Sequence, residues 1–130
     1  MTAKLLPTHL AQAIAQEAVK HEATPLREGQ VYAVLVAAGY TAKEIAELVG
    51  ADWNRVDLRL TLLDLVEEGK DALNEGLLPV GLAGYVARLS EPNQRLMLVR
   101  WLRGDFKNAR HAERYASAIH EDEQTVLAGL

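Results

Sequence analysis

Apolar residues recur at intervals of three and four along most of this chain, which is the spacing of amphipathic α-helices. In the first predicted helix, from Thr8 to about His21, the apolar stripe comprises Leu10, Ile14 and Ala18. No stretch of useful length alternates apolar and polar residues, as a half-buried strand would. The pattern therefore predicts an all-α protein.

The second predicted helix has a signal at each end. Thr24 is a suitable N-cap, and Pro25 follows at the first helical position, where its missing N–H costs nothing. Gly39 supplies the left-handed residue that ends the helix. The expected apolar face comprises Val31, Val34, Leu35 and Ala38. Further helices are expected at about 67–75, 80–89, 93–103 and 108–120.

Two short helices are predicted between Thr41 and Leu65. Thr41 and Glu44 have the spacing of a capping box at the start of the first helix. Gly50 can end this helix, and Asp52 can cap the second one. The result is two consecutive helices separated by a short turn.

The spacing within these helices is that of a helix-turn-helix. Ala46 is small enough for the second helix to pack closely across the first, and Val56 is a branched apolar residue within the second. In DNA-binding proteins with this motif, the N-terminal end of the second helix enters the major groove. A plain corner between two helices shows the same pattern without any ligand. We therefore expect a multi-helix domain built around a helix-turn-helix. The motif alone does not show whether it binds DNA.

Charge is segregated along the chain, whose net charge is −4. Residues 41–76 carry four basic against nine acidic side chains, a net −5, whereas residues 86–116 carry seven against three, a net +4. The acidic run Glu121–Glu123 follows. The basic footprint usual in nucleic-acid-binding proteins therefore lies after the predicted motif.

The start of the second motif helix holds the best candidates for DNA contacts. Asn54 can pair with adenine and Arg55 with guanine, although a solvated helix start has the same residues. Trp53 can lie against DNA or pack on a neighbouring helix, and Arg59 can reach phosphate or pair with a nearby aspartate, Asp52 or Asp57. The full candidate set is Thr41, Lys43, Trp53, Asn54, Arg55 and Arg59.

Five basic residues near the C-terminus are candidate phosphate contacts, or else a solvated helix face: Arg100, Arg103, Lys107, Arg110 and Arg114. The chain has no cysteine, no histidine pair at ligand spacing and no nucleotide-binding or nucleophile motif. We expect no metal, no cofactor and no enzymatic activity. Without an apolar run of about 20 residues or a signal peptide, a cytoplasmic protein without membrane association is expected.

Residues from about His21 to Gly104 resemble the central DNA-binding domain of ParB/KorB-type partition proteins. The resembling stretches are 24–32, 39–50, Val56, 58–65 and 75–83. Their most specific parts are a Gly-Tyr-Thr helix start at 39–41, a Leu-Leu-x-Leu exit at 62–65, and a Glu-Gly-x-Leu turn at 75–78 followed by Gly-x-Ala. The resemblance implies sequence-specific binding to a palindromic DNA site.

This sequence departs from the family pattern at several places. Ala42 stands where glutamine is common, Thr61 where arginine is usual, and Gly81–Gly84 reads Gly-Leu-Ala-Gly instead of Gly-His-Ala-Arg. These departures remove several expected phosphate contacts. The family's N-terminal nucleotide-binding segment has no counterpart here, so no CTP switch is expected.

The leading hypothesis is a homodimeric protein that binds double-stranded DNA in plasmid or phage partition or in transcriptional repression, with a partition or regulatory protein as a further partner. The alternative is a degenerate module of the same fold that binds protein without DNA. A third interpretation is a fragment of a longer partition protein. The expected organisation is an N-terminal helix at 1–23, a helix-turn-helix domain at 24–120 and an acidic tail at 121–130.

Overall fold

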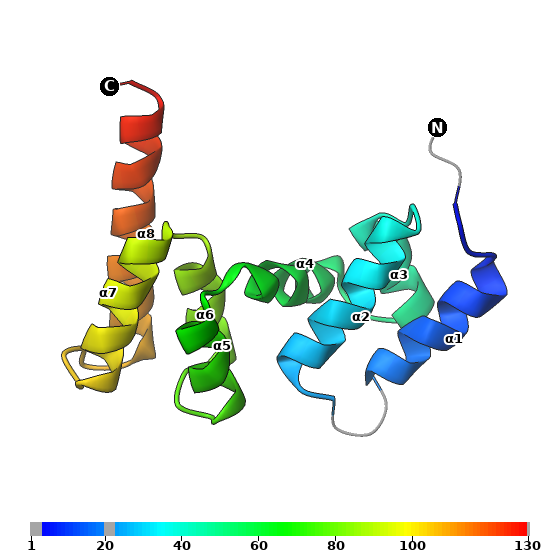
Figure 1. The fold of residues 1–130 in the computed structure, drawn as a ribbon, viewed down its shortest axis with the longest axis horizontal. Coiled ribbons are helices and arrows are strands. Elements are labelled where there is room, and N and C mark those ends of the chain that lie inside the picture. Colours follow the sequence, from blue (N-terminus) through cyan, green and yellow to red (C-terminus); the bar gives the residue numbers. More distant parts are fainter. Residues whose placement is uncertain (1–3, 20–22, 130) are drawn as a thin grey trace. The chain divides into compact units, whose positions relative to one another are not determined.

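The computed structural model describes residues 4–19 and 23–129, and the regular elements in this part of the chain are all helices (Figure 1). The predicted all-α fold is confirmed. The chain divides into two compact units, residues 1–63 and 64–130. The first contains α1 (Thr8–Val19), α2 (Pro25–Ala37), α3 (Ala42–Val49) and α4 (Trp53–Thr61). A 3₁₀ turn (Leu62–Asp64) follows, and then come α5 (Glu67–Asn74), α6 (Val80–Ala87), α7 (Glu91–Leu102) and α8 (Ala109–Leu127).

In α1, the buried face is made of alanines. Ala11, Ala15 and Ala18 are buried, whereas Leu10 is exposed. The predicted stripe of Leu10, Ile14 and Ala18 was therefore wrong in its first position, and Ile14 is half-buried at the edge of the core. The alanine face allows α1 to lie close to α2 and α3, and it contacts both helices. The expected end of this helix at His21 lies outside the described residues.

The buried face of α2 is also rotated from the predicted one. Leu35 and Ala38 are buried as expected, but Val34 is exposed and Val31 is only partly buried. The inward face consists of Leu26, Glu28, Gly29, Tyr32 and Leu35. Apolar spacing predicted the wrong face because two of these inward positions hold a glutamate and a glycine.

The second unit contains a polar side chain in its interior. Gln94 on α7 is buried, and its Oε1 accepts a hydrogen bond from the backbone N–H of Val66 at 2.8 Å. Its Nε2 donates to the carbonyl oxygens of Leu89 at 3.0 Å and Asp64 at 3.1 Å. One side chain thus satisfies backbone groups just before α5 and just after α6.

The last helix is longer than predicted. The sequence suggested an end near His120, but α8 continues through Glu121–Glu123 to Leu127. The carboxylate of Glu123 accepts hydrogen bonds from the backbone N–H of Ser90 at 3.0 Å and from Nδ2 of Asn93 at 2.8 Å. Part of the acidic run therefore links the end of α8 to the start of α7.

Candidate nucleic-acid interface

The helix-turn-helix is built by local capping, as the sequence predicted. The hydroxyl of Thr41 accepts a hydrogen bond from the N–H of Glu44 at 3.1 Å, and the Glu44 carboxylate accepts one from the N–H of Thr41 at 3.0 Å. Gly50 ends α3 with φ 69°, a left-handed conformation that favours glycine. Asp52 caps α4 by accepting from the N–H of Asn54 at 3.1 Å. The capping box, the glycine and the second cap are all confirmed.

The packing of the two motif helices also follows the prediction. Ala46 on α3 and Val56 on α4 are both buried, and Ile45 is fully inaccessible. These residues hold α4 against α3 and leave the first turn of α4 at the surface. Trp53 and Asn54 are exposed on that turn, and Lys43 is exposed on α3. Thr41 and Arg55 are exposed as well, so five of the six candidate residues are accessible to a large ligand.

A buried carboxylate joins α2 to α4. Glu28 on α2 is only 2% exposed, and its Oε2 accepts hydrogen bonds from the hydroxyl of Tyr32 at 2.7 Å and from Nε of Arg55 at 3.0 Å. Its Oε1 accepts from Nη2 of Arg55 at 2.9 Å and lies 3.5 Å from Nε of Arg59. Two-point contact between a guanidinium and a carboxylate fixes direction as well as distance. This arrangement, here called the Glu28 cluster, therefore sets the rotation of α4 against α2.

The electrostatics of the cluster keep Glu28 ionised. Burial alone would raise the pKa of Glu28, but the hydrogen bonds from Arg55 and Tyr32 and the charges of Arg55 and Arg59 outweigh it and lower that pKa. Burial and the hydrogen bond to Glu28 raise the pKa of Tyr32. The interior charge is thus compensated by two arginines and a neutral phenol.

Next to the cluster, α2 and α4 approach so closely that only glycine fits. A Cβ on Gly29 would lie 2.3 Å from the carbonyl oxygen of Arg59 and 3.0 Å from its carbonyl carbon. Because these are backbone atoms, no side-chain rotation could relieve the overlap. The glycine and the neighbouring glutamate together fix the position of α4.

The cluster changes the interpretation of two candidate DNA contacts. We expected Arg59 to reach phosphate or to pair with Asp52 or Asp57, but it pairs with Glu28 and its side chain is only 14% exposed. The Arg55 side chain is 49% exposed while it binds Glu28. The sequence did not single out Glu28 or Tyr32; their i, i+4 spacing on α2 beside Gly29 was the available signal.

The basic group near the C-terminus divides into two sets. Arg100 and Arg103 both pair with Asp105, at 3.4 and 2.6 Å, and the Arg100 guanidinium lies 4.5 Å from the centre of the Tyr115 ring. Lys107, Arg110 and Arg114 are exposed. Two of the five basic residues, Arg100 and Arg103, therefore form ion pairs within the chain.

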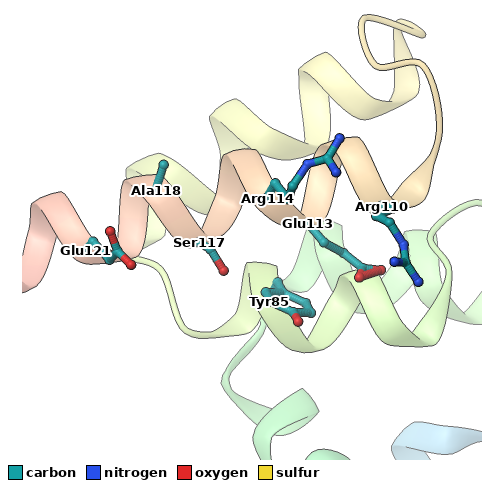
Figure 2. A pocket seen from close by; sticks show the side chains of 7 residues that line it. All are labelled: Tyr85, Arg110, Glu113, Arg114, Ser117, Ala118 and Glu121. Atoms are coloured by element: carbon teal, nitrogen blue, oxygen red, sulfur yellow. The ribbon is translucent and has the colours of Figure 1, made fainter.

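The exposed part of this group lies beside acidic residues. Figure 2 shows Arg110 and Arg114 on α8 interspersed with Glu113 and Glu121, with Tyr85 of α6 below them. These residues line an open groove of about 510 Å³ with Ser117 and Ala118. A groove with two arginines and two glutamates has no net charge of its own and is a poor match for a phosphate.

Other site types find no support in the part of the chain that the structure describes. In residues 4–19 and 23–129, no group of three or more histidine, aspartate or glutamate side chains could hold a metal ion. None of the described helices is both long and apolar enough to cross a bilayer.

In the first unit, α4 is the second helix of the motif, and it packs on α2 and α3 with its first turn exposed. This arrangement defines a helix-turn-helix protein. The family described as the ParB HTH domain matches residues 21–121. The chain belongs to this family, as its motifs suggested. No curated protein matches the sequence.

A solved structure has the same fold. It is described as the crystal structure of the DNA binding domain of the chromosome-partitioning protein ParB complexed to the centromeric parS site. The two chains are 23% identical, with a TM-score of 0.76, and the match covers 88% of this chain and 80% of that one.

Proposed function

We propose that this chain is a DNA-binding protein of the ParB type that inserts the first turn of α4 into the major groove of a duplex. The observation that carries the proposal is the accessible first turn of α4, held in a fixed orientation by the Glu28 cluster and by Gly29. A reading helix must be positioned within fractions of an ångström, and a buried two-point ion pair serves that purpose. Membership of the ParB HTH domain family and the fold of a ParB domain complexed to parS support the same function.

Trp53 and Asn54 are the proposed contacts with base edges or sugars, because both are exposed on the leading turn. Lys43 and Thr41 at the start of α3 are the proposed phosphate contacts. We propose that Arg55 and Arg59 position α4 through their ion pairs with Glu28. Arg55 is half exposed, so the outer edge of its guanidinium is still available to DNA. Plasmid or phage partition and repression are the biological roles proposed, with residues 24–120 as the DNA-binding domain.

The test is selection of a preferred duplex from a random library, followed by anisotropy measurements over a range of salt concentrations. Affinity should fall steeply with salt, and Lys43→Gln should reduce the slope of log K against log salt by about one. Asn54→Ala should cost about 1–3 kcal/mol on the selected site and much less on random DNA. Asn74→Ala is the matched control, because Asn74 is an exposed asparagine at the end of α5.

A second function has one observation in its favour. Residues 41–76, which include the motif, carry a net charge of −5, and Asp57 is exposed on α4. This favours a protein ligand with a basic surface over a polyanion. Absence of any duplex binding at low salt would exclude the DNA proposal and favour this one.

A further inference from the structure

The helix α4 carries an uncompensated acidic side chain on its exposed face. Asp57 lies four residues after Trp53 and three after Asn54, so helix geometry places it one turn further along, on the face that these two residues share. All three are exposed, whereas the adjacent Val56 is buried. In the part of the chain that the structure describes, the Asp57 carboxylate has no hydrogen bond and no ion pair, and only its backbone carbonyl accepts a hydrogen bond, from the hydroxyl of Thr61 at 2.8 Å. A ligand that reaches the first turn of α4 therefore also meets this negative charge.

The arginines of α4 are turned away from this carboxylate. Arg55 and Arg59 each lie two residues from Asp57, which places their side chains about 160° from it around the helix axis. Both guanidinium groups pair with Glu28 on α2, at 2.9 and 3.5 Å. The Glu28 cluster thus holds the positive charges of α4 on the side that packs on α2 and leaves the negative charge of Asp57 on the opposite side.

We propose that Asp57 selects a cytosine in the DNA site. An ionised carboxylate can only accept hydrogen bonds, and in the major groove only cytosine and adenine present a donor, their exocyclic amino group. Guanine and thymine present acceptor oxygens, which repel the carboxylate. In adenine the acceptor N7 lies beside the amino group and repels the second carboxylate oxygen, whereas cytosine has a C–H at that place. The inference rests on the proposed function, because it requires α4 to lie in the major groove.

The Asp57 carboxylate has two opposite effects on binding. It repels the phosphates of every duplex, whatever the sequence. At the correct site it gains a charge-assisted hydrogen bond from the amino group of cytosine. Loss of the carboxylate should therefore raise the affinity for random DNA and at the same time remove one base preference. A residue that contacts phosphate, or one that faces a protein ligand, does not produce this pair of effects.

The test compares the wild-type chain with Asp57→Ala by selection from a random duplex library and by anisotropy titrations. Asp57→Ala should bind random DNA about threefold more tightly, and the gain should shrink as salt is added, because the repulsion is screened. At one base pair, a wild-type preference for cytosine of about tenfold should disappear. That base pair should be the one that Asn54→Ala affects or its neighbour, since the two residues lie about 4.5 Å apart along the helix axis. Asp71→Ala is the matched control, because Asp71 is an exposed aspartate on α5, and it should change neither value.

A cytosine analogue without the amino group isolates the hydrogen bond itself. Pyrimidin-2-one has a hydrogen atom in place of the 4-amino group. At the selected position it should weaken binding of the wild-type chain about tenfold more than binding of Asp57→Ala. The weaker pairing of the analogue with guanine is the same for both proteins, so the difference between them reports the contact with Asp57. Circular dichroism confirms that each variant keeps its helices.

Three results would overturn the inference and leave the proposed function standing. They are unchanged base preferences in Asp57→Ala, equal effects of the analogue on the two proteins, and a wild-type preference for guanine, thymine or adenine at the position that Asp57→Ala affects. A wild-type chain that binds no duplex even at low salt refutes the proposed function, and this inference fails with it.

Discussion

Replacing Glu28 with glutamine keeps the size of the side chain and removes the negative charge that two arginines share. The largest cost comes from Arg59, whose side chain is 14% exposed and would lose its ion pair with Glu28. Leaving such a charge unpaired costs about 2–3 kcal/mol. Arg55 is half exposed and its guanidinium can be hydrated instead, so the loss of its ion pair with Glu28 adds about 1 kcal/mol. We expect Glu28→Gln to destabilise the protein by about 3–4 kcal/mol, a large part of a typical total of about 5–15 kcal/mol.

The assay is thermal and urea denaturation followed by circular dichroism and by Trp53 fluorescence in a Trp101→Phe background. Because Trp53 begins α4, its emission reports the helix that the cluster holds. The melting temperature should fall by about 10–15 °C for a chain of this size. Glu47→Gln is the control, since Glu47 is exposed on α3, and it should change the melting temperature by little.

Acid provides an independent check on the same charge. The folded-state pKa of Glu28 is lowered, so its stabilisation is present above the ordinary glutamate pKa of about 4.3 and is lost as pH falls through the folded-state value. The wild-type protein should therefore lose more stability than Glu28→Gln over that acidic range. Equal stability of the two proteins at neutral pH, or parallel acid profiles, would show that the charge of Glu28 does not stabilise the fold.

Two further predictions concern packing and buried polar groups, both measured by urea denaturation. Gly29→Ala forces a Cβ to within 2.3 Å of the Arg59 carbonyl oxygen and should cost about 2–3 kcal/mol. Gly81→Ala, whose Cβ would lie 3.8 Å from Oε2 of Glu113, should be close to neutral. Similar effects of the two would contradict the close approach of α2 and α4. Gln94→Leu leaves three backbone groups without their partner and should cost about 2–4 kcal/mol, while the exposed Gln124→Leu should cost little. An unchanged midpoint for Gln94→Leu would contradict its role in the interior.

The ends of the helices could be predicted from the sequence because capping acts over three or four residues. Thr24, Thr41 and Asp52 cap the helices expected of them, and Gly50 has the left-handed conformation that ends α3. A hydroxyl or carboxylate at an N-cap reaches a backbone N–H two or three residues further on, independently of the tertiary contacts of the helix. The Gly-Tyr-Thr motif at residues 39–41 was recognisable for the same reason, because Thr41 is one of these caps.

The buried faces and the anchoring of α4 depended on contacts between distant residues. Alanine, glycine and glutamate carry little apolar signal, yet Ala11, Gly29 and Glu28 face the interior because neighbouring helices approach them closely or neutralise them. Glu28 and Arg55 are 27 residues apart, and neither position alone indicates the pair. The amino-acid pattern alone was enough to predict an all-helical chain with a helix-turn-helix at residues 41–65. That Arg55 and Arg59 hold α4 in place follows only from the folded arrangement, because a charge is buried only where the fold brings its partner to it.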